Sequence, residues 1–282
     1  MNVEIIEQRL AIYQCKTRLD EINALKEISQ EIALMSLSKA GFFKEVEFHG
    51  GTALRILYGI NRFSEDLDFA LLKPTKKFNL NHYLKNIQND FDTYGIHVSS
   101  TDRKEISKTV QKQFLKIDSL GSELSLEYPG NRSEGKIKIK FEVDTNPPQG
   151  AKTELKYLTF PLSFSVLAKD QSSMFAGKLH ALLCRAYEKG RDWYDFVWFI
   201  SSKTDINYDL LTHAINQQGP WANQSIKIDR NWLIKQLSKK IKQLHWPNII
   251  QDVKPLLRTQ EQTALKVWGE AFFLSLTDKL VN

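Results

Sequence analysis

The sequence predicts a protein of the mixed α/β (α+β) class, with a mixed sheet flanked by helices and then a helical C-terminal half. Short runs of alternating apolar and polar residues occur between residues 46 and 166, and apolar residues recur at helical spacing almost everywhere after them. Pro147-Pro148-Gln149-Gly150 breaks the chain before the last extended run. We therefore expect an α/β domain over residues 1–165 and a helical domain over residues 166–282.

The first elements can be justified in chain order. Apolar residues at helical steps predict one or two helices over residues 22–40, and residues 46–48 form a short β-type run. Gly50 and Gly51 allow a tight turn before a helix starts at Ala53, and Gly59 ends that helix.

The rest of the first half alternates between strands and one helix. From Asp66 the pattern has a period of two, which predicts a strand, and residues 78–94 have the three- and four-residue apolar steps of a helix. Four further extended runs follow, over residues 96–100, 113–117 and 137–143 and near residues 157–166.

Composition limits the classes of protein that fit. A chain of 282 residues with 42% hydrophobic content can bury one large core or two modest ones. The net charge of +6 favours a polyanionic partner without establishing one. Cys15 and Cys184 are too few for a disulfide framework, and no signal peptide or membrane-spanning run is evident. We expect a soluble, unexported, cytoplasmic protein with no membrane partner.

The glycine turn and the strand that starts at Asp66 together predict a metal-dependent nucleotide site. The glycines let the backbone approach a ligand, and the N–H groups of a helix start attract phosphate. Asp66 and Asp68 share one strand face, roughly 6.5 to 7 Å apart along the backbone. They could bind one or two Mg²⁺ ions, which would clamp an in-line phosphoryl displacement. Each motif alone is common as a simple turn or a solvated acid, but their ordered combination is far more specific.

This segment resembles a known family. Gly50-Gly51-Thr52-Ala53-Leu54, followed by Arg62-x-Ser64-Glu65-Asp66-Leu67-Asp68-Phe69, is similar to the first motif of the AbiEii/AbiGii (MenT-like) nucleotidyltransferase toxins of the polymerase-β-like superfamily. Thr52 stands where serine is usual, and its hydroxyl can make the same phosphate contact. The resemblance implies nucleotide binding by Gly50, Gly51, Thr52, Arg62 and Ser64, although the Ser64 hydroxyl could instead cap the turn.

A third carboxylate is expected from a neighbouring strand, because members of this superfamily complete their metal site in that way. Residues 136–144 alternate cleanly and place Lys136, Lys138, Lys140, Glu142 and Asp144 on one face. Glu142 is our choice, and Asp144 is the alternative. The strand could also be half exposed, with its charges simply facing water.

Charged residues in two later helical segments complete the candidate set. Lys178 could place its ammonium on triphosphate oxygens and neutralise the leaving pyrophosphate, while Asp192 and Asp195, three residues apart, could orient Lys178 or bind nucleotide. Alternatively, Lys178 is a solvated lysine and Asp192 a helix N-cap. The similarity of these segments to later motifs of the same toxins, in the same order, favours function.

The resemblance implies a nucleotidyltransferase toxin of a toxin–antitoxin or abortive-infection pair, with an AbiEi-like antitoxin as partner. The implied reaction transfers a nucleoside monophosphate from a magnesium-bound triphosphate to an acceptor. Related MenT-type toxins use the tRNA 3′ end, so tRNA modification is the leading hypothesis. A lysine-rich helix face after Asp229 could hold RNA or simply face water. Transfer of a nucleotide or phosphate to a protein, or a non-catalytic nucleotide-binding module, remain alternatives.

Overall fold

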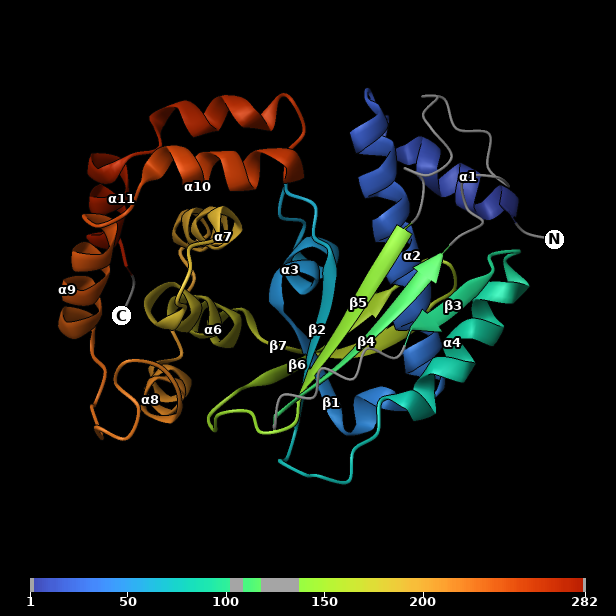
Figure 1. Cartoon of the computed structure of the whole chain (residues 1–282), viewed down its shortest axis with the longest axis horizontal. Helices are drawn as coiled ribbons and strands as arrows, with labels where there is room; N and C mark the ends of the chain where they lie inside the picture. The colour runs from blue at the N-terminus through green and yellow to red at the C-terminus, as the bar shows by residue number, and fades with distance from the viewer. Residues whose placement is uncertain (1–2, 102–108, 118–136, 281–282) are drawn as a thin grey trace. The chain divides into compact units, whose positions relative to one another are not determined.

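A computed structural model describes residues 3–101, 109–117 and 137–280 (Figure 1). The chain divides into two compact units. The first contains the chain up to residue 59 together with residues 63–147 and 155–168. The second contains residues 60–62, 148–154 and the chain from residue 169 onward.

The strands form one mixed sheet, which confirms the predicted fold class. Their spatial order is β3-β4-β5-β2-β1-β7-β6. β2 pairs in parallel with β5, and β1 in parallel with β7, while β1–β2, β3–β4 and β4–β5 are antiparallel. The strands are β1 (Val46–His49), β2 (Asp66–Leu71), β3 (Val98–Thr101), β4 (Val110–Ile117), β5 (Ile137–Asp144), β6 (Thr153–Leu158) and β7 (Phe164–Lys169).

The predicted single extended run near residues 157–166 was wrong, because two strands occupy this part of the chain. β6 ends at Leu158 and β7 begins at Phe164. The intervening residues include Pro161, which has no N–H group to donate to a strand ladder.

Four helices accompany the sheet in the described part of the first unit: α1 (Val3–Ile12), α2 (Arg18–Lys39), α3 (Gly50–Tyr58) and α4 (Asn81–Thr93). Helix α2 contacts α1, α4 and β5, and it begins earlier than expected, where the Thr17 hydroxyl accepts a hydrogen bond from the Asp20 N–H. Helix α3 packs on β1 and β2 and ends, as predicted, at Gly59 in the left-handed conformation.

One face of the sheet builds the core of this unit, and the other presents charges. On β2, Leu67 and Phe69 are buried, whereas Asp66 and Asp68 are half-buried. The Phe42 ring meets Phe69 edge to face, with the centroids 5.0 Å apart. The alternation predicted from Asp66 onward therefore positions two carboxylates by burying the side chains between them.

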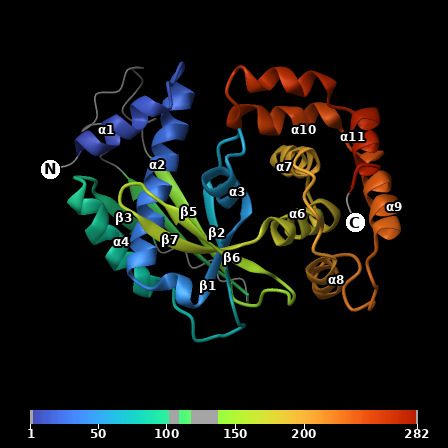
Figure 2. The same cartoon turned by 180° about the vertical axis from the view of Figure 1, so that it is seen from behind.

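The second unit is helical. Its helices are α6 (Gln171–Cys184), α7 (Gly190–Ser201), α8 (Tyr208–Gln217), α9 (Arg230–Ile241), α10 (Trp246–Val253) and α11 (Glu270–Thr277), with short 3₁₀ turns over Lys254–Leu256 and Glu261–Val267. Helix α7 lies between α6 and α10 (Figure 2). Trp246 stacks on Phe273 with the centroids 4.3 Å apart, and the fully buried Trp193 meets both rings.

The Asp229 carboxylate accepts a hydrogen bond from the Trp232 N–H and so caps α9, and the apolar stripe of α9 is buried at Leu233, Leu237 and Ile241. Among the helices that the structure describes, none is both long and apolar enough to cross a membrane.

Candidate active site

The glycine turn lies directly against the Asp-x-Asp strand. Gly50 starts α3 with a φ of 80°, a left-handed conformation that favours glycine. A Cβ added at Gly50 would collide with the Asp68 carboxylate. His49 occupies the N-cap position of α3, and its side chain makes no capping hydrogen bond there. The turn therefore leaves the backbone close to Asp68, as a site for a phosphate group requires.

Thr52 makes a contact within the protein, and its expected contact with phosphate remains a prediction. Its side chain is fully buried, and its hydroxyl donates a hydrogen bond to the backbone carbonyl of Asp66. The hydroxyl thus links α3 to the first residue of β2. In this conformation the Thr52 hydroxyl helps to fix the position of Asp66.

The strand register brings the three expected carboxylates onto neighbouring strands. Asp68 lies opposite Glu142 and Asp66 opposite Lys140 in the parallel β2–β5 pair, so the four side chains share one face. Asp144 lies opposite Ala70, two pairs further from the glycine turn than Glu142. The register therefore favours Glu142 over Asp144 as the third carboxylate.

Two lysines hold Glu142. The Nζ atoms of Lys140 and Lys112 lie 2.8 Å and 3.2 Å from the same oxygen, Oε1. Burial tends to raise the pKa of Glu142, but the two ammonium groups outweigh burial and hold it below the ordinary value. The sequence placed Lys140 on this face without a role, and it gave no sign of Lys112, because the β4–β5 register is not a local property.

The donor set suits a hard divalent cation, although no metal cluster is assembled. In the part of the chain that the structure describes, no three or more His, Cys, Asp or Glu side chains gather closely enough to hold a metal ion. Carboxylate oxygens are nevertheless the ligands that Mg²⁺ prefers. Asp66, Asp68 and Glu142 supply them from adjacent strands, and the absence of a Cβ at Gly50 lets the Asp68 carboxylate approach the backbone of the turn. The residues fit such an ion.

Helix α2 holds the segment that leads into Asp66. The Gln30 side-chain amide donates to the backbone carbonyl of Ser64 over 3.1 Å, and Lys26 forms an ion pair with Glu65 over 3.2 Å. Ser64 is itself buried. Sequence reasoning missed this support, because residues so far apart in the chain have no shared local pattern.

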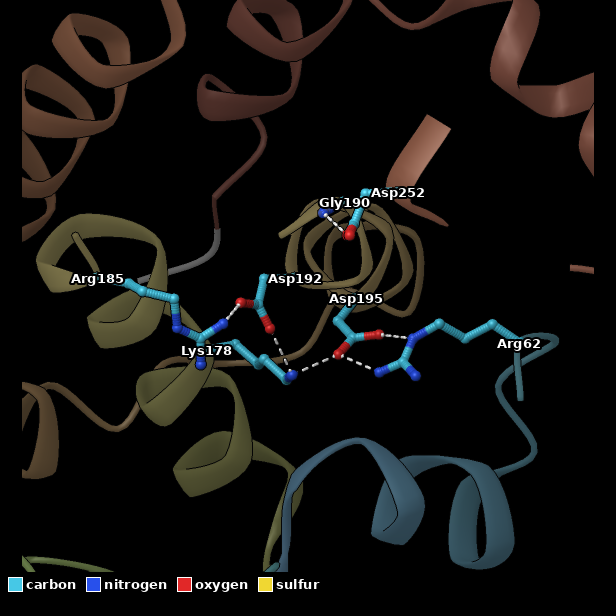
Figure 3. A network of polar contacts seen from close by, with 7 residues as sticks. All are labelled: Arg62, Lys178, Arg185, Gly190, Asp192, Asp195 and Asp252. Carbon is cyan, nitrogen blue, oxygen red and sulfur yellow. Dashed lines mark hydrogen bonds and ion pairs between the residues drawn. The ribbon is translucent and has the colours of Figure 1, made fainter. Parts of the chain in front are cut away.

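A second charged cluster lies within the helical unit (Figure 3). The Lys178 Nζ lies 2.9 Å from Asp192 and 2.7 Å from Asp195, which come from successive turns of α7. The expectation that these acids orient Lys178 agrees with this geometry. The alternative of a solvated Lys178 is wrong, since only 13% of its side chain is exposed.

Arg62 and Arg185 extend the cluster on both sides. The guanidinium of Arg62 donates to both carboxylate oxygens of Asp195 over 2.6 Å and 2.7 Å, and both side chains have no exposed surface. Arg185 pairs with Asp192. The expected contact of Arg62 with nucleotide remains a prediction that this geometry does not favour, because Asp195 already occupies its hydrogen-bonding fork.

The cluster keeps its members charged. Burial alone would lower the pKa of Lys178, but Asp192 and Asp195 outweigh it and raise that pKa. Burial tends to raise the pKa of Asp192, and Lys178 and Arg185 reverse this and lower it. Both shifts favour the charged forms, so Lys178 stays cationic and Asp192 stays anionic at neutral pH.

The start of α7 excludes the alternative that Asp192 is a helix N-cap. Lys189, and not Asp192, occupies the N-cap position, and Asp192 lies in the first turn. The Gly190 N–H donates to the Asp252 carboxylate over 2.7 Å, and a Cβ at Gly190 would collide with the backbone carbonyl of Ile249. Gly190 thus permits close packing of α7 against α10, and Asp192 pairs with Lys178 and Arg185.

A comparison with protein families identifies the family of this chain. Residues 32–271 match the family of the nucleotidyl transferase AbiEii toxin of type IV toxin–antitoxin systems. The chain belongs to this family. The AbiEii match contains the glycine turn, the three carboxylates and the Lys178 cluster, whereas Lys26 and Gln30 lie just before it.

Two solved structures from Helicobacter pylori are similar to this AbiEii chain at 16% identity. A candidate nucleotidyltransferase covers 90% of this chain and 95% of its own, with a TM-score of 0.44. The protein JHP933 covers 91% and 94%, with a TM-score of 0.45. None of the curated proteins matches.

Membership in the AbiEii family establishes the general activity. The protein is a nucleotidyltransferase toxin, so a nucleoside triphosphate is its substrate and an antitoxin its partner.

Proposed function

We propose that this protein transfers a nucleoside monophosphate from a magnesium-bound triphosphate to the 3′ end of tRNA and releases pyrophosphate. The observation that supports this most strongly is the pairing of Asp68 with Glu142 beside the glycine turn. Oxygen ligands and a phosphate-sized backbone turn therefore lie together in one unit. Binding and catalysis of nucleotidyl transfer require both.

Asp66, Asp68 and Glu142 would hold the divalent cation, in a site that could take two ions. The bound ion would neutralise charge on the triphosphate and favour ionisation of the attacking hydroxyl. The Glu142 carboxylate, with its low pKa, is ionised at neutral pH and available as a ligand. Thr52 would fix the Asp66 backbone while the cation is bound.

The phosphates would lie against the start of α3. Gly50 and Gly51 supply backbone N–H groups there, where the helix dipole also favours negative charge. Ser64 lies two residues before Asp66, the first residue of β2, and its hydroxyl is a further candidate for a phosphate contact.

Lys178 would assist as a fixed positive charge. Its ammonium is held between Asp192 and Asp195, so little reorganisation is needed when charge develops on the leaving pyrophosphate. Arg62 would support this arrangement through Asp195.

The net charge of +6 supports an RNA acceptor, as do the lysines of α9, a helix that also carries Trp232, whose ring pairs with that of Trp221. A tRNA acceptor would place the reaction in the cytoplasm. An AbiEi-like antitoxin is the partner that we propose.

The test is incorporation of label from each of the four α-labelled ribonucleoside triphosphates into total tRNA with Mg²⁺. The wild-type protein is compared with Asp66→Ala, which removes a ligand on the half-buried face and should leave the fold intact. We expect label on tRNA from at least one donor and none with the variant. Label that reaches protein and not RNA, or no label at all, would overturn the tRNA assignment.

A further inference from the structure

The ion pairs of Glu142 are unusual for a carboxylate expected to bind metal. Lys140 and Lys112 come from different strands, and both place their Nζ on Oε1. The register explains why: Lys112 lies opposite Glu142 in β4–β5, and Lys140 lies two residues before Glu142 on the same face. Two cations are therefore built into the face that presents Asp66 and Asp68.

The fold gains little from these pairs. All three side chains are about a quarter exposed, with 27% for each lysine and 24% for Glu142. Partly exposed ion pairs contribute about 0–1 kcal/mol each. Stability alone thus gives a weak reason for two lysines on one oxygen.

The arrangement of charges on this face is better explained by a bound triphosphate than by a role in the ligand-free protein. Three carboxylates meet two ammonium groups, and the electrostatic influence of Asp66 and Asp68 reaches Lys140. A divalent cation bound to Glu142 would lie close to the two ammonium groups on Oε1 and would be repelled by their charge. Triphosphate oxygens that arrive with the cation offer those ammonium groups new anionic partners.

We propose that Lys140 and Lys112 are nucleotide-binding residues, which hold Glu142 in the nucleotide-free chain and transfer to triphosphate oxygens when the metal-bound substrate arrives. This inference rests on the proposed function. It makes binding of metal and nucleotide interdependent, because without triphosphate the lysines compete with the cation for Glu142.

The test measures two affinities by isothermal titration calorimetry: that of a non-hydrolysable triphosphate with Mg²⁺, and that of Mn²⁺ alone. Lys140→Gln and Lys112→Gln should each weaken triphosphate binding by roughly tenfold, the size of one charge-assisted hydrogen bond. The same variants should bind Mn²⁺ alone more tightly than wild type. A merely structural loss would not produce these opposite changes.

Lys138→Gln is the matched control. It removes the same charge from the same face of β5, but Lys138 is exposed and contacts the Phe114 ring, 4.9 Å from the centroid. We expect neither affinity to change. Lys140→Arg, which keeps the positive charge, should recover most of the triphosphate affinity.

Unchanged triphosphate affinity in both glutamine variants, with wild-type binding intact, would overturn this inference alone. Weakened affinity for both ligands in both variants would also overturn it, because that indicates general damage. A wild-type protein that binds no triphosphate would instead overturn the proposed function. Circular dichroism of each variant checks folding. Lys112→Gln lies on β4 and Lys140→Gln on β5, so the two variants test the inference independently.

Discussion

The hydroxyl of Thr52 donates to the backbone carbonyl of Asp66 while its side chain stays fully buried. Thr52→Val keeps the shape but leaves that carbonyl without this donor, so we expect a loss of about 1–3 kcal/mol of unfolding free energy and slower transfer. Thr52→Ser should retain both. Urea denaturation and the transfer rate measure the two effects. A fully active Thr52→Val variant would contradict the positioning role.

Gly50 is restricted both by its conformation and by its neighbour. Gly50→Ala puts a methyl group onto the Asp68 carboxylate at a positive φ. Because the turn or the carboxylate must move, we expect metal-dependent nucleotide binding to fall steeply. Calorimetric titration of a triphosphate with Mg²⁺ measures this.

Gly177→Ala provides the matched control for Gly50→Ala. Gly177 lies inside α6 with nothing within 4 Å of an added Cβ, so alanine should stabilise the helix by roughly 0.5–1 kcal/mol. Binding should be unchanged. Equal binding by Gly50→Ala and Gly177→Ala would refute the steric argument.

At the scale of elements, the Arg62–Asp195 pair fixes one face of α7. Arg62→Met leaves the fully buried Asp195 with Lys178 as its remaining described cation. Breaking a buried ion pair on one side costs about 3–5 kcal/mol, and the remaining lysine should keep the loss near the lower figure.

The control for that loss is Lys39→Met, which removes the 2.6 Å ion pair of Lys39 with Asp90. The Lys39 side chain is 56% exposed, so the cost should stay below about 1 kcal/mol. Denaturant unfolding of the two variants distinguishes the pairs. Similar losses would mean that burial does not set the strength of the Arg62–Asp195 contact.

The α1–α2 packing predicts a dependence of stability on pH. Burial raises the pKa of Glu31 to about 7, although Arg9, 2.6 Å away, opposes the rise. The folded state thus binds a proton that the unfolded state releases above its pKa of 4.5. The stabilisation is complete below that pH, and up to about 3 kcal/mol is lost as pH rises through 7.

Urea denaturation at several pH values between 4.5 and 8 measures this slope. Glu31→Gln cannot titrate at this position and should lose that part of the slope. If wild type and variant have parallel profiles, the slope comes from other groups.

Local patterns were enough to predict much of the fold. Alternation placed Asp66 and Asp68 on one face, and Gly59 ended its helix as predicted. The β4–β5 register and the bidentate contact between Arg62 and Asp195 could not be predicted, because they join residues far apart in the chain. The sequence therefore identified candidate site residues but not which of them would contact one another.

On the scale of the whole molecule, two compact units each contain a charged cluster that falls within the AbiEii match. The first unit offers carboxylates, a glycine turn and two lysines on Glu142. The second offers Lys178 between two acids, with arginines at both ends of the cluster. In the proposed reaction the first cluster would supply cation ligands and phosphate contacts, and the second would supply fixed positive charge.

The most direct test of this account is the transfer rate of α-labelled nucleotide by Glu142→Gln beside that of Asp144→Asn, with the acceptor that the wild-type protein labels. Both variants remove one charge from the same face of β5, but only Glu142 lies opposite Asp68. We predict a loss of at least about a hundredfold for Glu142→Gln and a near wild-type rate for Asp144→Asn. Undiminished transfer by Glu142→Gln would contradict the assignment of this face as the active site.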